Sequence, residues 1–172
     1  HYTIYRNIIL KLIIVESPAK AKTIKNFLGK GYEVIASKGH IRDLPKSRFG
    51  ITIDEETNEL VPKYSVAKEN APTVKEITDL AKKADTIYIA TDEDREGEAI
   101  GWHIAHAIKK DPEELPRIVF HEITNSAINH ALESARKIDM DMVNAQQARR
   151  FPRPRLLPGV FQVEAMKCRF VH

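Results

Sequence analysis

The sequence contains only one cysteine, Cys168, among its 172 residues. A single cysteine excludes a disulfide framework and a cysteine-rich zinc site, and it suits a reducing compartment. No apolar stretch reaches the roughly 20 residues that cross a bilayer, so we expect no membrane partner. No small-residue cleavage site follows the short apolar run Ile8–Leu10, which argues against a signal peptide. We therefore predict a cytoplasmic protein.

A large excess of charge is also missing, because the formal net charge is only +3. This excess lies within residues 151–172, so residues 1–150 are neutral overall and bulk charge does not indicate nucleic-acid binding. The distribution of charge is more informative. Residues 11–48 carry nine Lys or Arg against three acids, whereas residues 92–98 carry five acids against Arg95. A basic segment facing an acidic turn is suited to binding a phosphate through a metal ion.

The apolar residues alternate between strand-like runs and helical spacing. Strand-like runs occupy 8–15, 32–37, 86–90 and 117–120, with possible edge strands at 50–53 and 60–66. Helical spacing occupies 19–28, 72–84, 95–109 and 140–150, and Thr124 can cap a further helix. This alternation predicts an α/β fold with a mostly parallel central sheet and helices on both faces.

The acidic turn, residues 92–98, follows a buried strand and precedes a helix. Ligands of open α/β folds bind at this carboxyl edge of the sheet. Asp92, Asp94 and Glu96 occupy alternate positions, so their carboxylates can converge on a cation that relieves their mutual repulsion. Oxygen ligands favour Mg²⁺ over Zn²⁺. The alternative is a solvated acidic turn that leads into a helix, whose N-terminus favours negative charge.

Five motifs, in order over residues 11–150, carry a resemblance to a known family. They are LIIVESPAKAKTI (12–24), GHIRDLP (39–45), ATDEDREGEAI (90–100), HEIT (121–124) and NAQQARR (144–150). A strand ending in Glu16 and a later strand ending in Asp92-x-Asp94 resemble the TOPRIM fold, which is Rossmann-like. The five motifs together are similar to the bacterial DNA topoisomerase I group of type IA topoisomerases.

The resemblance implies ATP-independent relaxation of supercoiled DNA, in which a tyrosine holds a transient single-strand break. Glu16 would handle the proton of the departing and returning sugar hydroxyl. Lys20 would place its ammonium on the scissile phosphate. Glu16, Asp92, Asp94 and Glu96 would hold Mg²⁺. The alternative for Lys20 is one of several solvated lysines on its helix.

The resemblance also implies contacts with a single-stranded DNA segment. Arg95 would touch the DNA or the phosphotyrosine as part of the catalytic group. His40, Arg42 and Arg149 would line the DNA path, although His40 could instead only shape its loop. By the same resemblance we expect a monomer.

The chain departs from the family pattern in its tyrosines and at both ends. None of its five tyrosines matches the nucleophile, which in the family lies in a separate downstream domain. We divide the chain into a non-family extension at 1–10, a TOPRIM domain at 11–137, the start of a further domain at 138–150, and an irregular, proline-rich tail at 151–172. The tail suggests a frame-shifted product. We therefore expect this chain to bind Mg²⁺ but to be inactive alone.

Two alternatives remain open. A stand-alone TOPRIM nuclease would use metal-activated water, and it predicts Mg²⁺-dependent DNA cleavage that is lost in Asp92→Ala. A non-catalytic DNA-binding module predicts salt-sensitive binding of single-stranded DNA without cleavage.

Overall fold

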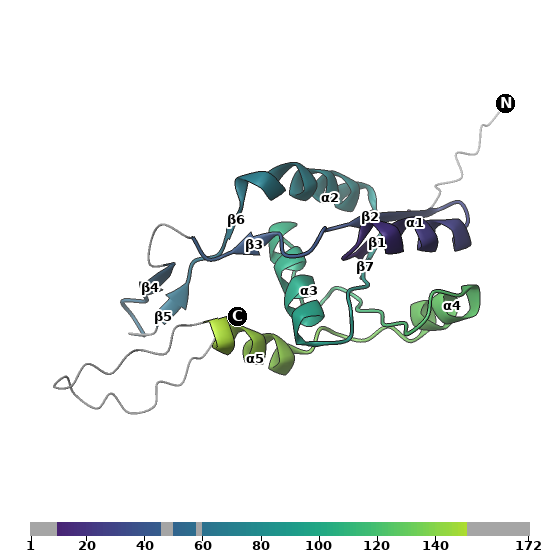
Figure 1. The fold of residues 1–172 in the computed structure, drawn as a ribbon. Coiled ribbons are helices and arrows are strands. Elements are labelled where there is room, and N and C mark those ends of the chain that lie inside the picture. Colours follow the sequence, from purple (N-terminus) through teal and green to yellow (C-terminus); the bar gives the residue numbers. More distant parts are fainter. Residues whose placement is uncertain (1–9, 46–49, 58–59, 151–172) are drawn as a thin grey trace.

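The computed structural model describes residues 10–45, 50–57 and 60–150 (Figure 1). The expectations for 1–9 and for the proline-rich tail at 151–172 lie outside these residues. Three parallel strands form the central sheet in the order β2-β1-β7. They are β1 (Lys11–Val15), β2 (Tyr32–Ala36) and β7 (Thr86–Ile89). The predicted α/β class with a parallel sheet is confirmed.

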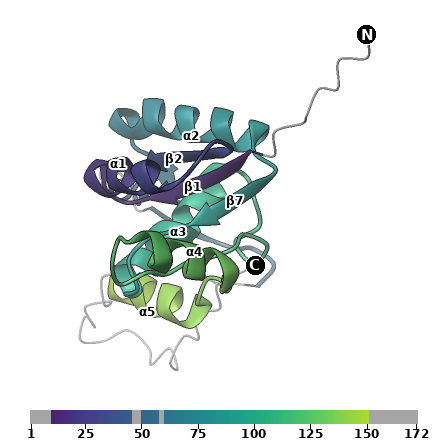
Figure 2. The ribbon, with the colours of Figure 1, turned by 90° about the vertical axis from the view of Figure 1, so that its right-hand side faces the viewer.

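Helices cover both faces of this sheet (Figure 2). Because side chains alternate along a strand, Leu12 and Ile14 of β1 face one side and Ile13 and Val15 the other. The first pair packs with α2 and α3, and the second with α1 and α4. The helices are α1 (Pro18–Phe27), α2 (Ala71–Lys83, preceded by the short turn η1, Lys68–Asn70), α3 (Arg95–Ala107), α4 (Asn125–Glu133) and α5 (Met140–Arg150).

Three of these helices begin at side chains that accept a hydrogen bond from the first turn. Ser17 accepts from the Lys20 amide at 3.1 Å, and Pro18 follows with a backbone angle suited to a helix start. Thr124 accepts from the Ala127 amide at 3.2 Å, as predicted. Asp94 caps α3, a role that the sequence analysis did not assign to it.

The prediction of a strand over Arg117–Phe120 is wrong, because the paired segment is much shorter. Only Arg117 pairs, through a parallel bridge to Ile89 and an antiparallel bridge to Arg136. Beyond this bridge the Arg117 side chain donates to the carbonyls of Thr91 and Asp92, so a guanidinium rather than a continued strand bonds this part of the turn.

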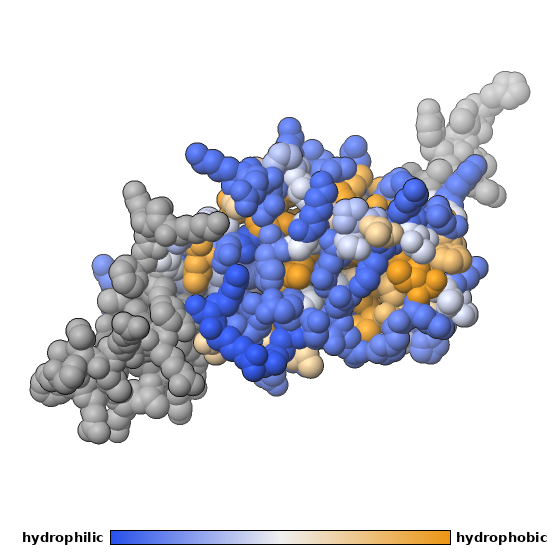
Figure 3. Space-filling view, viewed as in Figure 1, coloured by the Kyte–Doolittle hydropathy of each residue, from blue (hydrophilic) through white to orange (hydrophobic). Residues whose placement is uncertain are grey.

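Two antiparallel pairs lie beside the central sheet. Strand β4 (Ile51–Ile53) pairs with β5 (Leu60–Pro62), and β3 (Arg42–Asp43) pairs with β6 (Ser65–Val66). The predicted edge strand at 60–66 is therefore two short strands. The face in Figure 3 is mainly hydrophilic, with separate small apolar areas. None of the described helices is long and apolar enough to cross a membrane.

Helix α5 lies against α3 at the lower side of Figure 1. Its Val143, Gln146 and Gln147 are buried. The Gln147 amide lies 3.5 Å from the His103 ring of α3, and Gln146 donates to Glu96 at 3.3 Å. Residues beyond 137 thus complete the surroundings of α3, whose first turn carries the acidic residues.

Candidate functional site

The site begins where two neighbouring strands end. Because β1 and β7 are parallel and adjacent, their carboxyl ends meet at one edge of the sheet. Glu16 follows β1 and Asp92 follows β7 after two residues. The Asp92 amide donates to Oε1 of Glu16 at 2.7 Å, across 76 positions of sequence. The predicted meeting of these two segments is confirmed.

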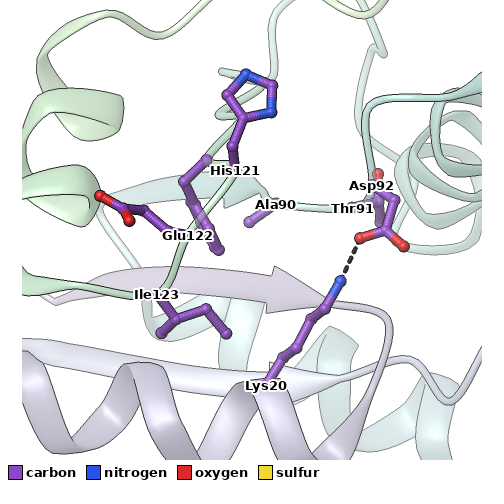
Figure 4. A pocket seen from close by; sticks show the side chains of 8 residues that line it. Lys20, Ala90, Thr91, Asp92, His121, Glu122 and Ile123 are labelled. Atoms are coloured by element: carbon purple, nitrogen blue, oxygen red, sulfur yellow. Dashed lines mark hydrogen bonds and ion pairs between the residues drawn. The ribbon is translucent and has the colours of Figure 1, made fainter.

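Lys20 adds a positive charge to the same place. The Ser17 cap starts α1, so Lys20 lies in its first turn, and its ammonium forms an ion pair with the Asp92 carboxylate (Figure 4). The two side chains are 37% and 50% exposed, so both are open to solvent and to a ligand. They border a cavity of about 170 Å³. Its lining also includes Ala90, Thr91, Phe120, His121, Glu122 and Ile123.

The other two predicted metal ligands have different partners. Asp94 accepts from the Gly97 amide at 2.6 Å as the cap of α3. Glu96 accepts from the His40 ring at 2.9 Å and from Gln146 at 3.3 Å. The hydrogen bond from His40 is the main cause that lowers the pKa of Glu96. The structure thus joins Glu16 to Asp92 and engages Asp94 and Glu96 elsewhere.

Within the described ranges, no three His, Cys, Asp or Glu side chains lie close enough to hold a metal ion together. The donor set at Glu16 and Asp92 still fits Mg²⁺ in its chemistry. Mg²⁺ usually takes one or two carboxylates and fills its shell with water and phosphate oxygens. At present the Asp92 carboxylate is neutralised by the Lys20 ammonium instead.

The residues expected to touch DNA lie on the elements around α3. His40 follows β2 and packs edge-on to His103, with ring centroids 6.0 Å apart. Arg42, in β3, lies over the rings of Tyr64 and Trp102 at 5.5 and 5.6 Å. Burial lowers its pKa.

Arg149 and Arg95 are both exposed, Arg149 in the last turn of α5 and Arg95 as the first residue of α3. Arg150, next to Arg149, forms an ion pair with Asp43 at 2.8 Å. The structure therefore places His40 and Arg42 against α3, and Arg149 at the end of the helix that packs on it.

His103 is fully buried on α3 beside His40 and Tyr64. Burial is the main cause that lowers its pKa to about 2, so the ring is neutral at neutral pH. Burial also raises the pKa of Tyr64 to about 12. Tyr64 therefore places an uncharged ring beneath the Arg42 guanidinium, and the neutral His103 ring packs beside it.

Two buried charges beneath the acidic turn were not predicted from the sequence. Glu98 and Arg117 are both 0% exposed and are joined by a hydrogen bond of 3.2 Å. Burial lowers the pKa of Arg117, and the carboxylates of Glu98 and Glu16 act against this shift. A signal was present, because Arg117 is a charged residue at the start of the apolar run RIVF. Charged residues are seldom fully buried without a partner.

Comparisons with known proteins show the family of this chain. Residues 11–123 match the Toprim domain family. The chain is 66% identical over 139 residues to DNA topoisomerase 1 of Campylobacter jejuni, which covers 81% of this chain and 20% of that protein. It is also 66% identical over 140 residues to DNA topoisomerase 1 of Helicobacter pylori, covering 81% of this chain and 19% of that protein.

The solved structure of full-length topoisomerase I from Thermotoga maritima is also similar, with a TM-score of 0.71 and 51% identity. The match covers 81% of this chain and 23% of that one. The α/β fold is that of a Toprim domain, and the chain belongs to the Toprim domain family. Its curated relatives here are DNA topoisomerases, which are isomerases, and it spans about a fifth of their length.

Proposed function

We propose that this chain supplies the Toprim part of a type IA DNA topoisomerase, which relaxes supercoiled DNA by transient breakage of one strand. The observation that carries the proposal is the meeting of Glu16, Lys20 and Asp92 at the ends of β1 and β7. Two carboxylates and one ammonium at one solvent-open edge suit the handling of a phosphodiester, because charge develops there during its cleavage. The similarity to DNA topoisomerase 1 of two bacteria supports the choice of reaction.

The proposed roles follow from this arrangement. The Lys20 ammonium would exchange its contact with Asp92 for a non-bridging oxygen of the scissile phosphate and stabilise the added negative charge. Glu16 would give a proton to the departing sugar oxygen and take it back on resealing. Arg95, exposed at the start of α3, would contact the DNA or the phosphotyrosine. The tyrosine nucleophile itself would come from another part of such an enzyme, outside the Toprim part.

We assign Mg²⁺ to Glu16 and Asp92, with Asp94 and Glu96 as further candidates. The ion would supply positive charge that aligns the cut ends for resealing. Asp94 would have to leave the Gly97 amide, and Glu96 would have to leave His40. At the main pair, Glu16 accepts from the Asp92 amide through Oε1 alone, and the Asp92 carboxylate would exchange the Lys20 ammonium for the ion.

The proposed partner is a single-stranded segment of DNA. His40, Arg42 and Arg149 would contact its phosphates and bases along α3 and α5. Arg42 lies over two aromatic rings, which helps to hold its guanidinium in place. The cytoplasmic location and the monomeric state stay predictions.

A domain exchange tests this proposal. Residues 11–150 would replace the matching segment of the Campylobacter jejuni relative, to which the chain is 66% identical. We expect the chimaera to relax negatively supercoiled plasmid in Mg²⁺ without ATP. Lys20→Ala within the chimaera should lower the relaxation rate by about a hundredfold or more, since one charge that stabilises a transition state is worth about that much. Agarose gel electrophoresis measures the rate.

Lys25→Ala is the matched control, because Lys25 lies on the same helix but pairs with Glu33, away from the site. It should relax plasmid at the parental rate. A folded chimaera with no activity would contradict the proposal. Mg²⁺-dependent nicking by this chain alone, lost in Asp92→Ala, would favour the nuclease instead.

A further inference from the structure

Among the described residues, the Arg117 side chain makes the largest number of hydrogen bonds. Its Nη1 donates to the carbonyls of Thr91 at 2.6 Å and Ile118 at 2.9 Å. Its Nη2 donates to the carbonyl of Asp92 at 2.7 Å, and its Nε to Oε1 of Glu98 at 3.2 Å. One planar guanidinium thus joins two successive carbonyls of the acidic turn to a buried carboxylate.

These contacts occur where the backbone ladder ends. Strand β7 stops at Ile89, and the Ala90 amide still donates to the carbonyl of Ile14 at 2.8 Å. The following carbonyls, of Thr91 and Asp92, belong to the turn into α3. A buried carbonyl without a partner costs free energy, and Arg117 supplies the partner from the neighbouring segment.

Glu98 keeps the buried guanidinium charged. Its Oε1 also accepts from Arg136 at 2.5 Å, and its Oε2 accepts from the Asp139 amide at 3.0 Å. Removing Glu98 or Arg117 would leave an uncompensated buried charge, whereas the Arg136 side chain is 37% exposed. Arg136 differs from Arg117 in one respect that matters here. Its guanidinium donates to Glu98 and to the Lys137 carbonyl, and among the described residues its hydrogen bonds do not include the Thr91 or Asp92 carbonyls.

Asp92 is held from two sides by this arrangement. Its carbonyl accepts from Arg117 at 2.7 Å, and its amide donates to Glu16 at 2.7 Å. With both backbone groups anchored, the freedom left to the Asp92 carboxylate is rotation of its side chain. The carboxylate then meets Lys20 at the cavity.

We propose that Arg117 is a positioning residue, which fixes the peptide groups on either side of Asp92 so that its amide meets Glu16 and its carboxylate meets the site. The purpose of this positioning rests on the proposed function, because the Asp92 carboxylate is the one assigned to Mg²⁺ there. The positioning itself is a property of the chain alone, so it is measured without DNA or metal.

Amide hydrogen exchange by NMR tests the inference. Arg117→Lys keeps a positive charge beside Glu98 but loses the planar fork that spans two carbonyls. We expect the Asp92 amide to exchange about tenfold faster or more, relative to the Ala90 amide of the adjoining ladder, because about 1.4 kcal/mol of local protection is lost. Arg136→Lys is the matched control and should change this ratio less than about twofold.

A purely structural role predicts a different result. If Arg117 only fills the core beside Glu98, Arg117→Lys speeds exchange of Asp92 and Ala90 equally, and the inference is overturned. If Arg117→Lys does not fold, the wild-type guanidinium is observed instead. Its Nη protons should then give separate, slowly exchanging signals with couplings to the Thr91 and Asp92 carbonyl carbons, and a single averaged signal would overturn the inference.

The Mg²⁺ concentration that half-saturates the same variants separates this inference from the proposed function. We expect Arg117→Lys to raise this concentration about tenfold and Arg136→Lys to leave it unchanged. A wild-type chain that binds no Mg²⁺ contradicts the proposed metal role alone, because the amide ratio decides the positioning of Asp92 independently.

Discussion

Replacing Gly97 with alanine is expected to lower the free energy of unfolding by about 3 kcal/mol or more, or to prevent folding. A Cβ at Gly97 would lie 1.9 Å from the carbonyl oxygen of Asp92, 2.7 Å from its carbonyl carbon and 2.9 Å from its nitrogen. These are backbone atoms, so no flexible side chain can move aside. Urea unfolding of wild type and variant measures the loss.

The clash is severe because the turn closes tightly over the first turn of α3. The Thr91 hydroxyl donates to the Gly97 carbonyl at 2.6 Å, and the Gly97 amide donates to Asp94. Gly29→Ala is the control, since nothing lies within 4 Å of a Cβ there. It should change stability by less than about 1 kcal/mol. If Gly97→Ala were as stable as Gly29→Ala, the described turn would be incorrect.

Replacing Glu98 with alanine should cost about 3–5 kcal/mol of unfolding free energy, since it leaves the buried Arg117 without its counter-charge. Glu98 is 0% exposed and accepts from Arg117, Arg136 and the Asp139 amide. Its loss would also leave the amide before α5 without this acceptor. Chemical denaturation followed by circular dichroism measures the change.

Glu93→Ala is the matched control for Glu98→Ala. Glu93 lies in the same turn, but its side chain is 46% exposed and its contact is with the exposed His121 at 3.4 Å. Such surface pairs contribute about 0–1 kcal/mol, so this variant should unfold near wild type. Equal losses in the two variants would contradict the buried ion-pair account.

The sequence predicted those parts of the fold that depend on local pattern. Apolar runs located β1, β2 and β7, helical spacing located four helices, and the Thr124 cap indicated a fifth. The Thr124 cap was predictable because it depends on residues within one turn. The meeting of Glu16 with Asp92 was predictable as well, since both follow parallel strands whose carboxyl ends share one edge.

The partners of the remaining acids could not be predicted in this way. Alternate spacing places Asp94 and Glu96 near Asp92 along the chain, but their side-chain directions depend on the start of α3 and on His40 and Gln146. Those two residues lie 56 and 50 positions from Glu96. Arg117 was predicted as part of a strand because the carbonyls that its side chain contacts, those of Thr91 and Asp92, lie 26 and 25 positions away in the sequence.

The central claim is that Glu16 and Asp92 form one Mg²⁺ site, and titration of this chain with Mg²⁺ tests it most directly. Mg²⁺ at about ten times its dissociation constant should stabilise the wild-type fold by about 1.4 kcal/mol, seen as a higher melting midpoint. Glu16→Gln and Asp92→Asn should each raise the Mg²⁺ dissociation constant about tenfold and so reduce the stabilisation, whereas Glu93→Gln should keep the wild-type constant. An unchanged midpoint in the wild type, or an equal response in Asp92→Asn, would contradict the claim.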